Sequence, residues 1–427
     1  MIRFIHAADL HLDRPFEGLS DLPRPLHERV RNSTFKALDK MVDITLSERA
    51  DFLIIAGDIF DSSHRSITAQ HRFIHAMKKL SEASVPVYLV FGNHDHLDDP
   101  WNHLRLPENV HVFSDKPEMI PFQKKNGERV HLYGFSYRQR RVRDNMAARY
   151  QKEDGADYHI GILHGALLKG NREDTYAPFS LKDLTEKDFN YWALGHIHKR
   201  MQLSPELPVW YPGDTQGLSV KETGDKGVSC VELNGMEAHV RFCPTADIIW
   251  MRKGISIQGE LTADTLEVKI GQIREEMRRT DETGVFLLLD LSVAGSDQHF
   301  EGTEELFQEL LDAMNEDETY RDDFVWLLSG VVRFMQQWEP GQILKSPHFL
   351  GDVFRLIESD QAINEALSPL LQHRLGRRYL DAPDEETAAR IKAEAEQILA
   401  ESLFPGSASG AAERGRRSPA GSAENED

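Results

Sequence analysis

The sequence lacks features that would place it in several large classes of protein. It has only two cysteines, Cys230 and Cys243, in 427 residues, too few for a disulfide framework and typical of a reducing compartment. No apolar run approaches the roughly 18 residues that a membrane helix needs. Polar Asp9 and His11 interrupt the N-terminal apolar stretch, so we expect no signal peptide. These absences predict a cytoplasmic protein without membrane association, whose two cysteines are buried, inert thiols.

Positive charge is also scarce. The chain has 50 basic and 70 acidic side chains, a net charge of −20, which argues against coating nucleic acid by electrostatics alone. A local basic groove is still compatible with this balance, because residues 138–143 read RQRRVR. We interpret that run as the solvated start of a helix, with phosphate contacts as the alternative. Much of the acid lies in residues 301–323, interpreted as a solvated helical face pointing away from any polyanion.

The sequence does contain an alternation of strand and helix patterns. Apolar, β-branched runs predict strands, and long helical patterns separate the first three of them. This order predicts an α/β layered core. The predicted strands cover residues 2–8, 52–56, 86–91, 130–135, 158–163, 191–194, 209–212, 228–233 and 237–243, and the first two helices cover 25–49 and 67–83.

The pattern divides the chain into four regions. After the α/β core comes a strand–helix–strand–helix module of the kind that caps a larger domain. A helical stretch follows, and then a tail with almost nothing to bury, which we predict to be disordered. The α/β domain, the α+β cap, the helical C-terminal region and the tail cover residues 1–245, 246–335, 336–404 and 405–427.

Metal-ligating side chains follow five of the predicted strands. Because ligands of open α/β sheets bind outside the carboxyl ends of the strands, we expect these side chains to converge. Seven such groups would be costly to bury unpaired, and two divalent cations sharing one carboxylate would satisfy them. Oxygen and imidazole ligands without thiolate favour Mn²⁺, Fe²⁺ or Zn²⁺. The seven are Asp9, His11, Asp58, Asn93, His164, His196 and His198, with Asp58 as the shared ligand.

Each motif alone has a simpler interpretation. A Gly-Asp pair after a strand is often a turn or a helix cap. A lone histidine is more often a hydrogen-bonded core or surface residue, and for His96 we favour the surface. The five motifs in order, each at a strand end, are far harder to attribute to chance. The simpler interpretation is kept for His6, His71, His75, His103, His111, His131 and His159.

Together these motifs resemble the signature of the calcineurin-like metallophosphoesterases over about residues 1–200. They read D-x-H (9–11), G-D-x-x-D (57–61), G-N-H-D (92–95), H-G (164–165) and G-H-x-H (195–198). Within that superfamily the chain is similar to the SbcD-type DNA repair exonucleases, through HAADLHLD, GDIFD and YPGDTQG. The resemblance implies a four-layer β-sandwich flanked by helices. Asp214 stands where SbcD-type proteins usually have serine, a departure that bears on how this loop contacts DNA.

The resemblance also implies roles for individual residues. His94 matches the family's catalytic histidine, which Asp95 would orient. The family's preferred ion is Mn²⁺, and the chain has no P-loop motif for ATP. One metal would be held by Asp9, His11, Asp58 and His198, and the other by Asp58, Asn93, His164 and His196.

The implied activity is hydrolysis of DNA phosphodiester bonds as an exonuclease or endonuclease in DNA repair. A phosphatase or small phosphodiester hydrolase of the same superfamily is the alternative, and a catalytically silent scaffold is the third hypothesis. Relatives pair with a coiled-coil ATPase of the SbcC type, for which residues 347–403 are the candidate contact. The sequence leaves a homodimer open.

Overall fold

The computed structural model contains two six-stranded sheets and one three-stranded sheet. The element types follow the predicted α/β order, so the predicted fold class is confirmed. None of the helices described is both long and apolar enough to span a bilayer. The structure describes residues 1–19, 22–62, 66–99, 105–168, 176–235, 237–258, 261–295, 302–336, 366–369 and 395.

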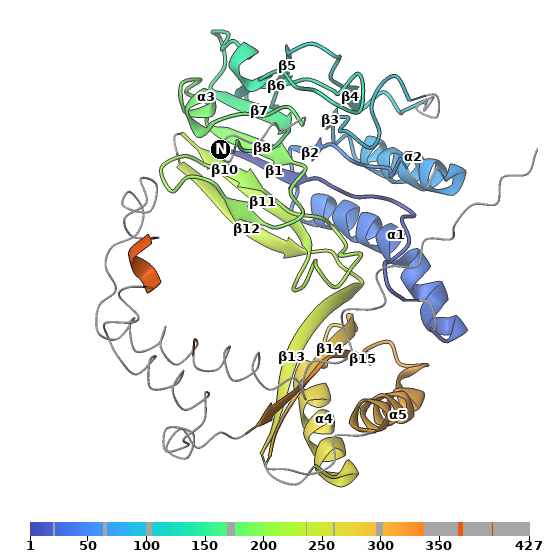
Figure 1. The fold of residues 1–427 in the computed structure, drawn as a ribbon. Helices are drawn as coiled ribbons and strands as arrows, with labels where there is room; N and C mark the ends of the chain where they lie inside the picture. The colour runs from blue at the N-terminus through green and yellow to red at the C-terminus, as the bar shows by residue number, and fades with distance from the viewer. Residues whose placement is uncertain are drawn as a thin grey trace, which may run out of the picture. The chain divides into compact units, whose positions relative to one another are not determined.

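The first sheet holds the N-terminal strands and is covered on one face by helices. Its parallel strands are β1 to β4, joined by an antiparallel hairpin. Helices α1 (Arg24–Ser47) and α2 (Ile67–Glu82) lie on its outer face (Figure 1), where Leu38 and Phe73 pack in one buried cluster with Ile55. The strand order is β12 (Glu237–Pro244), β11 (Gly227–Asn234), β1 (Ile2–Ala7), β2 (Phe52–Ala56), β3 (Val87–Val90) and β4 (Val110–Val112).

The second sheet packs on the other face of the first. Phe4 and Ile54 of the first sheet share a buried cluster with Ile160 of the second. The outer face of the second sheet is covered by the short helices α3 (Leu181–Thr185) and η1 (Ala147–Arg149). Strands β2 and β3 of the first sheet, FLIIA and VYLV, are buried and almost entirely apolar, as expected for strands covered on both faces. The strand order is β5 (Glu118–Gln123), β6 (Arg129–Gly134), β7 (Tyr158–His164), β8 (Tyr191–Gly195), β10 (Val209–Tyr211) and β9 (Met201–Gln202).

The third sheet belongs to the predicted α+β module. Its order is β13 (Ile248–Gln258), β14 (Gly284–Gly295) and β15 (Val325–Gln336), with helices α4 (Ala263–Met277) and α5 (Thr303–Asn315) between these strands in the chain. Acidic side chains of α5 are exposed as predicted, but Glu318 in the next turn, η2 (Glu316–Glu318), is buried against Arg278.

The described residues fall into two compact units. The predicted domain limits stay a prediction, and the predicted C-terminal helices lie almost entirely outside the described residues. Every predicted metal ligand lies in the first unit. That unit comprises residues 1–253, 267–289 and 308–329, and the second comprises the described parts of 254–266, 290–307 and 330–427.

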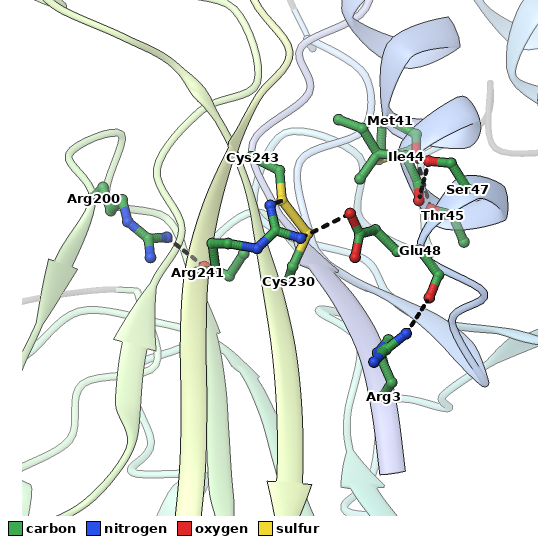
Figure 2. The surroundings of a disulfide bond; sticks show 11 residues. Arg3, Met41, Ile44, Thr45, Ser47, Glu48, Arg200, Cys230, Arg241 and Cys243 are labelled. Atoms are coloured by element: carbon green, nitrogen blue, oxygen red, sulfur yellow. Dashed lines mark hydrogen bonds and ion pairs between the residues drawn. A yellow bond between two sulfur atoms is a disulfide. The ribbon is translucent and has the colours of Figure 1, made fainter.

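The cysteines differ from the sequence prediction. Cys230 and Cys243 form a disulfide, so the expectation of two free thiols is wrong. The register of the β11–β12 hairpin pairs Cys230 with Arg241, which places the two cysteines diagonally across the hairpin with Cα atoms 6.4 Å apart. Figure 2 shows the Arg241 guanidinium beside the disulfide, ion-paired to Glu48 (2.8 Å). The disulfide removes the argument for a reducing compartment that rested on the cysteine count.

Candidate metal centre

Five strand ends from both six-stranded sheets bring the predicted ligands together. The loops after β1, β2, β3 and β8 supply most of them, and the last residue of β7 supplies one. Backbone hydrogen bonds join the first two loops. The amide of Asp9 donates to the carbonyl of Gly57, and the amide of His11 donates to the carbonyl of Asp58. Five ligands are almost fully buried, Asp9, His11, Asp58, Asn93 and His164, and two are half-buried, His196 and His198.

One cluster consists of Asp9, His11 and His198. Each offers a ligand atom within 4.8 Å of the others. The Nε2 atoms of His11 and His198 are 3.1 Å apart. Two nitrogens bound to one ion at right angles, with bonds of about 2.1 Å, lie about 3 Å apart. The facing imidazole nitrogens therefore fit two ligands of a shared cation.

A second cluster lies beside the first. Asp58, His164 and His196 offer ligand atoms within 4.8 Å of one another. The side-chain oxygen of Asn93 is 3.0 Å from His164 Nε2 and 3.2 Å from His196 Nδ1. Asp58 Oδ2 lies 3.4 Å from His164 Nε2 and 3.9 Å from His11 Nε2, so its carboxylate stands between the two clusters. This is the position that a bridging ligand requires.

The backbone of the site adopts an uncommon conformation. Asp9, His11, Asp58 and His196 all have positive φ, at 53°, 41°, 53° and 99°. The left-handed region costs a non-glycine residue roughly 1–3 kcal/mol and is concentrated at functional sites. Surrounding hydrogen bonds hold it; both carboxylate oxygens of Asp9, for example, accept the amide of His196 (3.0 and 3.1 Å).

Comparison with known proteins identifies the family. The family model "Calcineurin-like phosphoesterase" matches residues 2–200, which include all the candidate ligands. The chain is 36% identical over 405 residues to "Uncharacterized metallophosphoesterase YhaO" of Bacillus subtilis, covering 94% of this chain and 98% of that one. The chain belongs to the calcineurin-like phosphoesterase family. It is therefore a phosphoesterase, which is a hydrolase.

More distant relatives of this phosphoesterase are named as DNA repair proteins or nucleases. It is 26% identical to "DNA double-strand break repair protein Mre11" of Methanocaldococcus jannaschii, over 57% of this chain and 66% of that one. It is 24% identical to a component of "Nuclease SbcCD" of Staphylococcus saprophyticus, over 57% of this chain and 69% of that one. These alignments cover little more than half of the phosphoesterase.

His94 lies at the edge of the phosphoesterase's two clusters. Its ring meets that of His11 edge to face with centroids 5.1 Å apart, and its amide donates to Asp58 Oδ1 (3.0 Å). The carboxylate against its Nδ1 is Asp61 (3.4 Å), which also lies 3.6 Å from His11 Nδ1. Burial alone would lower the pKa of His94, but Asp61 and the other nearby carboxylates raise it above its usual value. His94 therefore stays protonated to higher pH than an exposed histidine.

Asp61 lies against the His94 ring, and the orienting role predicted for Asp95 stays a prediction. The Asp95 carboxylate accepts the amides of Gly92 and Ile59, both at 2.7 Å, and so fixes the loop that carries His94. Sequence reasoning quoted Asp61 in the G-D-x-x-D motif without giving it a role. The sequence feature that could have identified Asp61 is its position three residues after Asp58, in the same loop at the metal-ligand edge of the sheet.

A further group of side chains holds His198. Glu222 Oε1 accepts from His198 Nδ1 (2.5 Å), and Lys226 Nζ donates to the His198 carbonyl (3.2 Å). Lys226 also pairs with Asp214 (2.8 Å), which is 2% exposed. Buried in this way, the Asp214 carboxylate is not presented to a DNA surface. The aspartate that stands in place of the SbcD-type serine therefore belongs to the group of side chains that hold His198.

Electrostatics also fit a cation site. Burial raises the pKa of Asp9 to about 7. Burial opposes the charged forms of His164 and His198, but neighbouring carboxylates, Asp58 and Glu222 first among them, raise both pKa values to about 9. The side chains of Asp9, His164 and His198 thus tend to keep their protons, on atoms that would bind the metal ions. Because ligands must lose those protons to bind metal, metal affinity should increase with pH.

The remaining predicted positions behave differently from the ligands. His6 is a buried core residue, as predicted, bonded to the Tyr191 hydroxyl (3.0 Å) and the Leu194 carbonyl (3.1 Å). His103 lies outside the described residues. Residues 138–143 are exposed apart from half-buried Val142, but the predicted helix start is wrong. Their backbone pairs with neighbouring loops, which leaves it unable to form helical hydrogen bonds.

Proposed function

We propose that this phosphoesterase is a metal-dependent DNA nuclease of the SbcD type that cleaves phosphodiester bonds with a dinuclear centre. One observation carries the proposal. Two ligand clusters are built from buried residues of five strand ends, and Asp58 stands between them. Such a pair of sites is suited to the in-line displacement of phosphate esters. Support for DNA as substrate comes from the names of the Mre11 and SbcCD relatives.

The donor set of oxygen and imidazole ligands without thiolate fits two divalent ions such as Mn²⁺, Fe²⁺ or Zn²⁺. Mn²⁺ is the proposed metal because the family resemblance implies it. Bound there, the ions would supply Lewis acidity toward the phosphoryl oxygens and lower the pKa of attacking water. Asp9, His11, Asp58 and His198 would hold one, and Asp58, Asn93, His164 and His196 the other.

Side chains of this protein would supply the proton for the leaving oxygen and stabilise the charge that develops on the phosphoryl group. The His94 ring, held by Asp61, lies beside His11 at the edge of the clusters. With its raised pKa it can donate a proton to the leaving oxygen or a hydrogen bond to the phosphoryl group. Asp95 keeps the loop in place through the amides of Gly92 and Ile59.

A coiled-coil ATPase of the SbcC type is the proposed partner, through residues 347–403. A cytoplasmic location and a homodimer stay predictions. The alternative activity, hydrolysis of a phosphomonoester or a small phosphodiester, is favoured by the net charge of −20, which opposes binding of a polyanion.

The deciding experiment is degradation of linear duplex and single-stranded DNA, labelled at the 5′ or 3′ end, in the presence of Mn²⁺. His94→Gln is the matched variant, and calorimetry checks that it still binds Mn²⁺. We expect degradation by the natural chain and its loss in the variant. If DNA stays intact while bis(p-nitrophenyl) phosphate is hydrolysed, the chain alone is not a DNA nuclease and the alternative holds.

A further inference from the structure

Three exposed arginines stand out in a chain of net charge −20. Arg140, Arg141 and Arg143 are exposed, and within the described part of the chain none of them forms an ion pair. Arg138, in the same run, behaves like an ordinary surface residue and pairs with Asp98 (3.3 Å) and Asp115 (3.5 Å). Clustered cations repel one another, so three neighbouring guanidinium groups without anions indicate that the anion comes from a ligand.

The segment that carries these arginines is attached at its first end to the candidate metal centre. Tyr137 donates its amide to Phe91 (3.0 Å) and accepts the amide of Leu97 (2.9 Å), which enclose the His94 loop. Its ring meets that of His164 edge to face, with centroids 5.6 Å apart. The backbone preceding the arginines is therefore fixed beside a candidate ligand of the second metal.

The other end of the segment is attached beside a different candidate ligand. Val142 accepts the amide of Ala177 (2.7 Å) and forms a β-bridge with Tyr176. The Tyr176 ring packs on His196 with centroids 4.8 Å apart. Residues 138–143 thus run from a neighbour of His164 to a neighbour of His196.

We infer that Arg140, Arg141 and Arg143 form a phosphate-binding strip that holds the sugar–phosphate backbone of DNA against the metal centre. The inference rests on the proposed nuclease function and adds to it the residues that bind the substrate. Arginine suits this role because its planar guanidinium binds phosphate in a bidentate manner and always carries its charge. In an acidic protein, such a strip would concentrate attraction for a polyanion at the place where chemistry occurs.

The test compares two triple variants that remove the same charge. One is Arg140→Gln, Arg141→Gln and Arg143→Gln. The control is Arg49→Gln, Lys125→Gln and Arg129→Gln, three exposed positions that precede or begin β2 and β6, at the edge opposite the metal ligands. Fluorescence anisotropy with labelled single-stranded and duplex DNA, in a His94→Gln background with Mn²⁺, measures affinity at about 50–200 mM salt, a range over which the Debye length falls about twofold. Calorimetry checks Mn²⁺ binding in both variants.

We expect the strip variant to bind DNA at least about tenfold more weakly at low salt, and the control to bind like the parent. In a plot of log affinity against log salt concentration, the magnitude of the slope should fall by about 2.7 for duplex DNA, at about 0.9 per lost phosphate contact. An unchanged affinity and exponent in the strip variant, or an equal loss in the control, would overturn the inference. If the His94→Gln parent binds DNA through the strip but the natural chain with Mn²⁺ never degrades DNA, the nuclease proposal fails while the inference stands. If the parent does not bind DNA, both fail.

Discussion

Glu222 provides the sharpest test of how the metal centre is held. Its carboxylate lies 2.5 Å from His198 Nδ1, on the opposite side of the ring from the Nε2 that faces His11. Its other oxygen accepts the amide of Leu218 (2.6 Å), which fixes the carboxylate in place. A carboxylate on the far nitrogen sets the tautomer of a ligating histidine and increases its basicity.

The magnitude follows from this arrangement. Removing such a partner typically lowers metal affinity 10–100-fold, or about 1.4–2.7 kcal/mol. Glu222→Ala should show the full loss, because nothing then accepts from Nδ1. Glu222→Gln keeps an oxygen acceptor but not the charge, so we expect an intermediate affinity. The ranking of the two variants distinguishes two effects of Glu222 on His198, orientation of the ring and the increase in its basicity by the carboxylate charge.

The assay is calorimetric titration of the metal-free protein with Mn²⁺ at fixed pH, with thermal unfolding as a check of the fold. Glu186→Ala is the control, since Glu186 is exposed and its only described ion pair is a surface one with Lys182 (3.5 Å). A folded Glu222→Ala protein that binds Mn²⁺ as tightly as the natural chain would refute the assignment of Glu222 as the positioning residue of His198.

Three further predictions concern other parts of the first unit. Gly92→Ala should weaken Mn²⁺ binding at least about tenfold by calorimetry, because the new Cβ would lie 2.3 Å from Asp58 Oδ1. Burial lowers the pKa of His6 to about 3, so the unfolded chain takes up a proton near pH 6.5 that the folded chain refuses. Between pH 7 and pH 5 the natural chain should therefore lose about 2 kcal/mol more stability in urea unfolding than His6→Gln does. Glu318→Gln should cost about 1.5–3 kcal/mol in urea unfolding, because it removes the charge that pairs with Arg278 (2.7 Å), which keeps its ion pair with Glu275 (2.8 Å).

Each of these predictions has a matched control in the chain. Gly254→Ala places a methyl group in open space. His239→Gln and Glu309→Gln change exposed side chains. A variant that behaves like its control would contradict the corresponding prediction.

The candidate ligands could be predicted because a strand end is a local signal. Each is preceded by an apolar run that must be buried, and parallel strands carry their last residues to one edge. Asp58 was singled out as the shared ligand because its motif contained no other assigned ligand, and its carboxylate does lie between the clusters. The family resemblance then divided the ligands into two sets. Three members of each set lie together in the structure, and the assignment to two metals stays a prediction.

Contacts that depend on register and loop path could not be predicted in this way. The disulfide requires the β11–β12 register, which places Cys230 and Cys243 diagonally opposite and which alternation alone leaves undefined. The role of Glu222 requires a turn that returns to His198 across 24 residues. The arginine run suggests a helix by composition, but long-range pairing of Val142 with Tyr176 overrides that local preference.

The two kinds of support around the metal centre use separate residues. Glu222 and Lys226 hold His198, in the cluster with His11. Tyr137 and Tyr176, at the ends of the arginine segment, contact His164 and His196 of the other cluster. Because the two groups share no side chain, Glu222→Ala should change metal affinity and the triple arginine variant DNA affinity. In the combined variant, each affinity should change by as much as it does in the corresponding separate variant. A strongly non-additive double variant would mean that DNA and metal are bound through a common contact.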